Sequence, residues 1–131
     1  MTTVLVVEDR SDTRNMVVEA LRKSGYAVLE AEDGEKALEI VGSKNVDCIL
    51  LDILLPKKDG GQVLTAVRAN KKNDHIKIVM ITAAKATPAT IRLYKKNGAN
   101  GFLLKPLQVK EIRDEIGRVL KMTKKKSAHS L

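Results

Sequence analysis

Five short apolar segments punctuate the chain, at residues 4–7, 27–29, 48–51, 78–81 and 102–104. Most are nearly unbroken runs rich in Val, Ile and Leu, which is typical of strands covered on both faces in a parallel sheet. The stretches between them carry apolar residues at helical spacing, so strand and helix alternate five times in units of about 25 residues. This alternation predicts right-handed β-α-β crossovers and a three-layer α/β sandwich around a parallel sheet.

Residues that start or stop helices stand at the boundaries of these units. Ser11 or Asp12 is suited to cap the first helix and Asp33 the second, because their side chains accept hydrogen bonds from free backbone N–H groups. Pro88 suits the first turn of the fourth helix, and Gly98 is suited to end it. The fifth helix is marked by an apolar stripe made of Val109, Ile112, Ile116, Val119 and Leu120.

Charged and hydroxyl side chains stand directly after the apolar segments. They are Glu8, Asp9, Asp52, Thr82 and Lys105. In an open parallel sheet, ligands bind at the carboxyl ends of the strands. Carboxylates brought together there repel one another, and Mg²⁺, which accepts carboxylate oxygens and waters, resolves that repulsion. A metal ion beside Asp52, Lys105 and Thr82 is suited to a phosphoryl group, with Asp52 as the nucleophile that forms an aspartyl phosphate.

Four segments in this order resemble a response-regulator receiver domain of the CheY-like kind: residues 4–9 (VLVVED), 50–60 (LLDILLPKKDG), 81–83 (ITA) and 97–106 (NGANGFLLKP). The resemblance implies a flavodoxin-like (βα)5 doubly wound sandwich with a parallel sheet in the order 2-1-3-4-5. It divides the chain into a receiver domain at residues 1–121 and a short basic C-terminal tail at residues 122–131. We therefore expect the single-domain form of the receiver.

The resemblance also implies a phosphotransfer reaction of two-component signalling. Asp52 would accept a phosphoryl group from the phosphohistidine of a sensor histidine kinase or a phosphotransfer protein. The metal, Mg²⁺ or Mn²⁺, would be held directly by Asp9, Asp52 and the backbone carbonyl of Leu54, and by Glu8 through water. The protein would catalyse only its own phosphorylation and dephosphorylation, and would not be a turnover enzyme acting on an external substrate.

The remaining site residues carried over from the family bind phosphate or respond to it. Thr82 and Lys105 would bind the phosphoryl oxygens. Phe102 takes the place of an aromatic switch that rotates inward as Thr82 shifts, and Pro106 would follow a cis peptide bond, which X-Pro pairs tolerate. The switch would reshape a partner-binding surface formed by the fourth helix, the fifth strand and the fifth helix.

The sequence departs from the family's pattern near the phosphoacceptor. Lys57 and Lys58 stand where a small and an apolar residue are usual, and Gly61 replaces an apolar residue that opens the third helix, which is expected to loosen that loop. At two positions that tune phosphoryl lifetime the chain has Leu54 and Ala84, neither of which can orient a water molecule. We therefore expect slow self-catalysed dephosphorylation.

The charge of the chain is unevenly distributed. The formal net charge is +8, with the acidic residues concentrated in the first half and the basic residues in the second. A basic fourth and fifth helix predicts an acidic output partner whose association is sensitive to salt. Two alternatives stay open: a receiver fragment of a larger regulator or hybrid kinase, and a basic module that binds polyanions or nucleic acid. We expect no specific nucleic-acid recognition, because three aromatic residues cannot build a base-stacking platform.

Other classes of protein are disfavoured by composition. No apolar stretch approaches the roughly 20 residues of a membrane helix, and the first residues lack the pattern of a signal peptide. The single cysteine, Cys48, excludes an internal disulfide and a cysteine-rich zinc site, and its apolar surroundings predict that it is buried. The glycine-rich motifs of dinucleotide and P-loop sites are absent from the sequence. We expect a cytoplasmic protein without a membrane partner, either a monomer or a phosphorylation-dependent dimer.

Overall fold

A computed structural model describes residues 1–83 and 86–122. Ala84 and residues 123–131 of the predicted tail lie outside the described residues. The five strands are β1 (Thr3–Val7), β2 (Ala27–Ala31), β3 (Cys48–Asp52), β4 (Lys77–Thr82) and β5 (Gly101–Leu104). The α-helices are α1 (Ser11–Lys23), α2 (Gly34–Ser43), α3 (Gly60–Arg68), α4 (Pro88–Lys96) and α5 (Val109–Leu120), and a short 3₁₀ helix, η1 (Lys71–Asn73), precedes β4.

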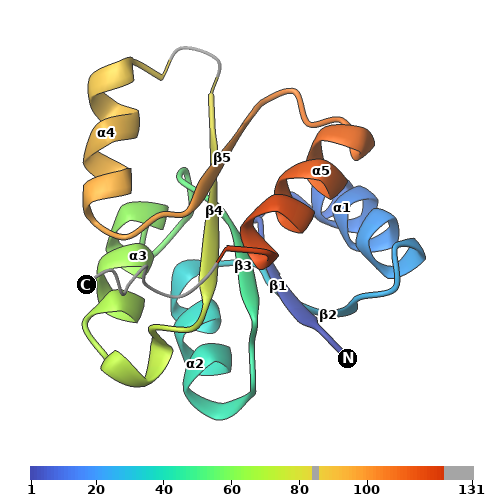
Figure 1. Ribbon diagram of the computed structural model, residues 1–131, viewed down its shortest axis with the longest axis horizontal. Coiled ribbons are helices and arrows are strands. Elements are labelled where there is room, and N and C mark those ends of the chain that lie inside the picture. Colours follow the sequence, from blue (N-terminus) through green and yellow to red (C-terminus); the bar gives the residue numbers. More distant parts are fainter. Residues whose placement is uncertain (84–85, 123–131) are drawn as a thin grey trace.

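The five strands form one sheet in the order β2-β1-β3-β4-β5, and every neighbouring pair is parallel. Helices α1 and α5 cover one face of the sheet, and α2, α3 and α4 lie on the other (Figure 1). This is the predicted flavodoxin-like arrangement. Since the order reverses between β1 and β3, the carboxyl ends of these two strands flank the crevice in which such sheets bind ligands.

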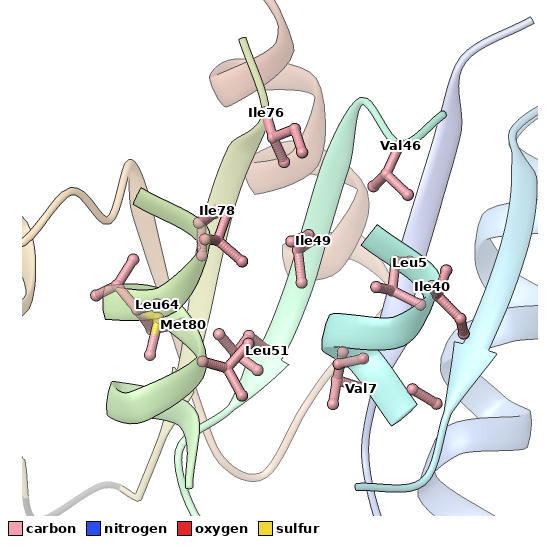
Figure 2. Packing of buried hydrophobic residues seen from close by; sticks show 14 of the residues in the cluster. Leu5, Val7, Ile40, Val46, Ile49, Leu51, Leu64, Ile76, Ile78 and Met80 are labelled. Atoms are coloured by element: carbon pink, nitrogen blue, oxygen red, sulfur yellow. The ribbon is translucent and has the colours of Figure 1, made fainter. Parts of the chain in front are cut away.

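The central strands are buried on both faces, which explains their unbroken apolar sequences. In β1, Leu5 and Val7 pack under α2 and α3, whereas Val4 and Val6 pack under α1 and α5. Strands β3 and β4 alternate in the same way, and Figure 2 shows the side chains that meet beneath α2 and α3. Cys48 is fully buried in the other cluster, as predicted. Because side chains alternate along a strand, the sheet separates two apolar cores.

Several predicted helix boundaries are confirmed. The side chain of Asp33 accepts a hydrogen bond from the N–H of Lys36 and caps α2. Pro88 is the first residue of α4, and Gly98, two residues after the helix ends, has a positive φ of 113°. Glycine suits that conformation because it has no Cβ.

The predicted cap of the first helix is wrong. Neither Ser11 nor Asp12 caps α1, because the extended N-cap conformation falls on Arg10 and Ser11 is already helical. The N–H of Arg10 is held by the side chain of Glu8, so the chain turns into the helix one residue earlier than the polar residues suggest.

The second strand is longer than its apolar segment. The prediction ended it at residue 29, but its pairing with β1 continues through Glu30 and Ala31. Glu30 is exposed because β2 lies at the edge of the sheet. A polar residue on an edge strand interrupts the apolar run without interrupting the backbone ladder.

Helix α4 is attached differently from the other α-helices of the described chain, because it contains no buried residue. Its Tyr94 is half-buried and packs against the cluster under α2 and α3. A Cβ on Gly61 of α3 would approach the Tyr94 ring to 3.3 Å. Asp59 and Gln62 form a capping box at the start of α3, and the loosening expected from Gly61 stays a prediction.

The start of α2 lies directly against the loop between β3 and α3. A Cβ on Gly34 would overlap the backbone oxygen of Lys58 and lie 2.7 Å from its Cβ. The backbones approach this closely because position 34 has no side chain.

We predict that Gly34→Ala lowers the free energy of unfolding by about 1–3 kcal/mol, since the backbone of Lys58 must shift. Gly117→Ala is the matched control: Gly117 lies inside α5 with no atom near its missing Cβ, so alanine should add roughly 0.5–1 kcal/mol through helix propensity. Urea unfolding of both variants measures the difference. Equal stability of the two variants would contradict the close approach at Gly34.

Candidate functional site

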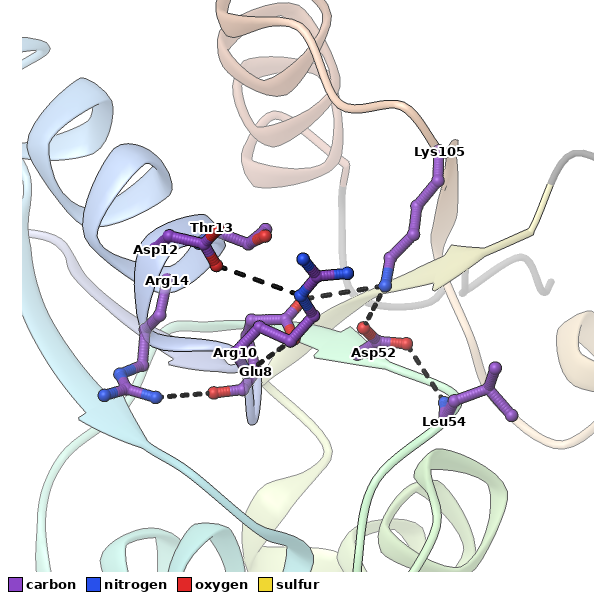
Figure 3. A network of polar contacts seen from close by, with 8 residues as sticks. All are labelled: Glu8, Arg10, Asp12, Thr13, Arg14, Asp52, Leu54 and Lys105. Carbon is purple, nitrogen blue, oxygen red and sulfur yellow. Dashed lines mark hydrogen bonds and ion pairs between the residues drawn. The ribbon is translucent and has the colours of Figure 1, made fainter.

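Glu8, Asp52 and Lys105 meet at the carboxyl edge of the sheet (Figure 3). Glu8 follows β1, while Asp52 and Thr82 are the last residues of β3 and β4. Glu8, Asp9 and Asp52 each place one carboxylate oxygen so that the three atoms lie within 4.8 Å of one another. Lys105 follows β5 and points into the same group. The sheet thus brings together three carboxylates, one hydroxyl and one ammonium.

Lys105 is the positive partner of this acidic cluster. Its Nζ donates a hydrogen bond of 2.7 Å to Oδ2 of Asp52 and lies 3.7 Å from Oε1 of Glu8. Partial burial disfavours the charged ammonium, but the hydrogen bond and charge of Asp52, together with Glu8 and Asp9, outweigh burial and raise the pKa of Lys105. The Lys105–Pro106 peptide bond is cis, as predicted. The ammonium is therefore held in its charged form beside Asp52.

Glu8 is the most deeply buried of the carboxylates, with 1% of its surface exposed. Its Oε2 accepts a hydrogen bond from the N–H of Arg10 at 3.0 Å. Burial raises the pKa of Glu8 to about 7, and the charge of Asp52 adds to this, while the Arg10 hydrogen bond and the charge of Lys105 oppose it. A divalent cation placed among these oxygens would favour the ionised form of Glu8.

Asp52 is held in a fixed orientation at the end of β3. It is 2% exposed; its Oδ2 receives Lys105, and its Oδ1 accepts a 3.0 Å hydrogen bond from the N–H of Leu54. Gly60 packs directly on the backbone at this point, since a Cβ there would lie 2.5 Å from the Asp52 carbonyl oxygen. Leu54, whose N–H contacts this buried carboxylate, is itself 73% exposed at the surface.

The donor set fits a hard divalent cation and an oxygen-rich ligand. Two buried side-chain polar atoms of the described residues have no hydrogen-bond partner: Oε1 of Glu8 and Oγ1 of Thr82. Such atoms are costly to bury unless a ligand satisfies them. Mg²⁺ prefers a few carboxylate oxygens with waters completing its octahedron. The cluster of Glu8, Asp9 and Asp52 is therefore suited to bind a metal.

Phe102 lies in β5 beneath the same edge of the sheet. Its ring is half-buried and packs against the apolar cluster under α2 and α3. Its N–H donates a 3.0 Å hydrogen bond to Oε2 of Glu115 in α5, and Arg118 in turn donates to both oxygens of Glu115. Glu115 thus satisfies a backbone donor on an edge strand and links that strand to α5.

Sequence reasoning did not find two arginines that support the acidic cluster. Arg14 donates to the backbone oxygen of Glu8 at 2.9 Å and forms an ion pair with Glu30 of β2 at 3.2 Å, and Arg10 provides the N–H that holds Oε2 of Glu8. The sequence feature that could have indicated them is their position at the start of α1, directly after the consecutive acids Glu8 and Asp9. The hydrogen bond from the N–H of Leu54 to Asp52 was not predicted, and the metal-binding role predicted for the Leu54 carbonyl stays a prediction.

The five-stranded parallel sheet and the charged cluster at its carboxyl edge define a flavodoxin-like α/β protein with a switch-point site. Residues 4–117 match the family described as response regulator receiver domain. The chain belongs to this family of two-component signalling proteins. No helix among the described residues is both long and apolar enough to span a membrane.

Solved structures and curated relatives agree with this assignment. The chemotaxis response regulator CheY4 of Vibrio cholerae has a TM-score of 0.85 and 32% identity, over 91% of this chain and 98% of its own. The receiver domain of NtrX from Brucella abortus has a TM-score of 0.82 and 25% identity, over 92% of this chain and 99% of its own.

The curated relatives are longer proteins. A cyclic di-GMP phosphodiesterase of Thermotoga maritima is 37% identical over 119 residues, which is 91% of this chain but 31% of the relative. The transcriptional regulatory protein SrrA of Staphylococcus aureus is 30% identical over 120 residues, which is 92% of this chain and 48% of that protein. The chain thus spans between about a third and a half of their lengths.

The Glu115 contacts generate a pH-dependent prediction. The hydrogen bond from Arg118, aided by the N–H of Phe102, lowers the pKa of Glu115. An acid with a lowered pKa stabilises the fold above its usual pKa and loses that contribution as the pH falls through its lowered value. Glu115→Gln should therefore cost about 1–2 kcal/mol at neutral pH and much less at about pH 3.

Urea unfolding at the two pH values measures this difference. Glu111→Gln is the matched control, because Glu111 lies on the same helix with an exposed side chain and should change stability little at either pH. A loss for Glu115→Gln that is equally large in acid would show that the charge of Glu115 is not responsible.

Proposed function

We propose that this receiver domain is a phosphorylation-dependent signalling module in which Asp52 accepts a phosphoryl group from a phosphohistidine on a histidine kinase or phosphotransfer protein. The observation that carries the proposal is the position of Asp52: it is almost fully buried, yet it is held between the Lys105 ammonium and the Glu8–Asp9 carboxylates. A carboxylate hydrogen-bonded to a fixed cation is a nucleophile with an electrostatic partner for the incoming oxygens.

The chemical step is a displacement at phosphorus. A carboxylate oxygen of Asp52 forms a bond to phosphorus as the bond from phosphorus to the donor's imidazole nitrogen breaks, and the imidazole leaves with the electron pair. The Lys105 ammonium, already at hydrogen-bond distance from Asp52, would then bind a phosphoryl oxygen. The Thr82 hydroxyl, buried without a partner among the described residues, would donate to another.

The proposed metal is Mg²⁺, with Mn²⁺ as a substitute, held by Asp9, Asp52 and the carbonyl of Leu54, with Glu8 acting through water. When bound, it would neutralise charge on the phosphoryl oxygens. The close approach of the Glu8, Asp9 and Asp52 oxygens supports this assignment. Without the metal, Lys105 is the one cation that the described side chains place against both Asp52 and Glu8.

The proposed output surface consists of α4, β5 and α5, and the switch residues are Thr82 and Phe102. Lys105 donates its N–H to the carbonyl of Thr82 at 2.9 Å, so β4 and β5 are joined at the site. Phe102 lies three residues before Lys105 in the sequence. Its side chain packs against the apolar cluster under α2 and α3. A shift of Thr82 toward a phosphoryl oxygen would therefore act on the strand that carries Phe102.

The charge of this surface favours an acidic output partner. Two of its cations are neutralised within α5, because Lys110 pairs with Asp114 and Arg118 with Glu115, each at 2.8 Å. The exposed cations without an ion pair among the described residues are Arg92, Lys95, Lys96, Arg113 and Lys121. An acidic surface would be attracted to them in a salt-dependent manner. The proposal includes no specific nucleic-acid partner and no output enzyme within the domain.

A second candidate is that the domain is the receiver segment of a larger regulator or hybrid kinase. The lengths of the curated relatives favour it, because the matched part is 31% of one and 48% of another. Their names, a phosphodiesterase and a transcriptional regulatory protein, describe two kinds of output that a receiver accompanies in those proteins. The receiver chemistry proposed for Asp52 is the same in either case.

We predict that incubation with Mg²⁺ and acetyl phosphate adds one phosphoryl group to the protein, measured as a mass increase of the intact chain. Asp52→Asn should abolish the gain, as should removal of the metal with EDTA. Asp74→Asn, which changes an exposed acid far along the chain from the site, should be modified like the wild type. A wild-type protein that gains no phosphoryl group under these conditions contradicts the proposal.

We also predict that the phosphorylated protein is long-lived, because the exposed apolar side chain of Leu54 beside Asp52 cannot orient an attacking water. Leu54→Asn supplies a polar group there and should accelerate hydrolysis by about tenfold or more. The phosphodonor is removed, and the loss of the phosphoryl group in the presence of Mg²⁺ is then measured as a decrease in the mass of the intact chain. Leu93→Asn, at an exposed leucine of α4, is the control. Rapid hydrolysis by the wild type would overturn this prediction.

A further inference from the structure

The loop between β3 and α3 contains a residue in an unusual backbone conformation. Lys57 has a φ of 68° and is the one non-glycine residue with positive φ among those described. A lysine adopts this left-handed conformation rarely, since its Cβ crowds the backbone, and it persists where surrounding contacts hold it. The loop runs from Asp52 to the start of α3, so whatever holds Lys57 acts on the segment beside the phosphoacceptor.

The contacts of Lys57 lie at the start of α2. Its Nζ is 3.5 Å from Oδ2 of Asp33 and 3.8 Å from Oε1 of Glu35. Asp33 is a fixed partner, because its side chain is 12% exposed and its other oxygen, Oδ1, caps α2 through the N–H of Lys36. The hydrogen bond from the Lys36 N–H is the largest cause of a lowered pKa of Asp33. The ammonium of Lys57 lowers this pKa further. Lys57 is thus drawn toward a carboxylate that the helix already holds.

The loop also touches α2 through its backbone. Gly34, which lies between the two acids, has no side chain, and this permits the carbonyl of Lys58 to lie directly on it. Further along, the N–H of Gly60 donates to the carbonyl of Ile53 at 2.8 Å and closes the loop on itself. The Leu54 N–H that contacts Asp52 therefore belongs to a closed loop whose outer side rests on α2.

We propose that Lys57 is a positioning residue for the Asp52 site: its ammonium clamps the loop of residues 53–59 to Asp33 and Glu35 at the start of α2, and so holds Leu54 beside Asp52. The link to metal binding rests on the proposed function, because Leu54 is the loop residue assigned to the metal. The clamp itself is a property of the loop and can be measured without metal.

The sign of the effect distinguishes the clamp from simple electrostatics. Lys57 and Lys58 are adjacent cations on the same loop, but within the described chain only Lys57 has an ion pair. Removing either charge reduces the repulsion of a nearby cation, which by itself strengthens Mg²⁺ binding. Removing Lys57 also releases the loop from α2, and this release weakens Mg²⁺ binding. Lys58→Met is therefore the matched control for Lys57→Met.

The test is titration of the intact chain with Mg²⁺ alone, followed by calorimetry or by backbone amide NMR signals. Lys57→Met should weaken the Mg²⁺ affinity about two- to fivefold, whereas Lys58→Met should leave it unchanged or strengthen it. Lys57→Arg keeps the charge and should restore the affinity. Lys57→Gly relieves the left-handed backbone but lacks the charge, so it should weaken the affinity like methionine.

A second readout needs no metal. Amide hydrogen exchange should speed up several-fold at residues 54–60 in Lys57→Met and not in Lys58→Met. Glu35→Gln should cause a smaller increase in the wild-type background and none in Lys57→Met, because both changes act on one contact.

The outcomes separate the two proposals. If the wild type binds no Mg²⁺, the proposed function fails, whatever the loop does. If the wild type binds Mg²⁺ but Lys57→Met binds as tightly as Lys58→Met with unchanged hydrogen exchange, the clamp is wrong and the proposed function stands.

Discussion

The burial of two carboxylates beside a single ammonium is the constraint on which the site depends. Asp52 and Glu8 are 2% and 1% exposed, and Lys105 is the cation that contacts both. Two buried negative charges with one positive partner leave an excess that the protein interior tolerates poorly. The pKa of Glu8, raised to about 7 by burial, is the consequence. A parallel sheet makes this crowding unavoidable, because it delivers every strand end to one edge. The same crowding makes the edge suited to a small, highly charged cation.

Much of the fold could be predicted because the sequence states it locally. Unbroken apolar runs mark strands buried on both faces, and Asp33, Pro88 and Gly98 act at helix ends through their own backbone chemistry. The site followed from the fold, since residues directly after the strands had to share an edge. Part of the basic charge of α5 is cancelled within the helix, and the cations of α4 and α5 that have no ion pair among the described residues are exposed.

What could not be predicted depends on contacts between distant segments. The N-cap of α1 is Arg10, whose N–H is held by Glu8, and the preference of polar residues for caps cannot anticipate a hydrogen bond made by an acid at a strand end. The pattern around Gly61 could not indicate that Tyr94 of α4 lies close to this glycine. In the sequence, Lys57 stands out only because it departs from the usual residue of the receiver family. Its ion pairs could not be predicted, because Asp33 and Glu35 lie more than twenty residues away in the chain.

Helix α4 shows what the uneven anchoring of the helices implies. A helix held by fully buried side chains must expose apolar area to move, and each such side chain adds to the cost. Helix α4 has none; its half-buried Tyr94 packs against the cluster under α2 and α3 and lies close to Gly61. Among the α-helices of the described chain, its displacement is therefore expected to cost least in lost burial. We therefore expect α4 to shift more readily than the helices that buried side chains anchor to the sheet.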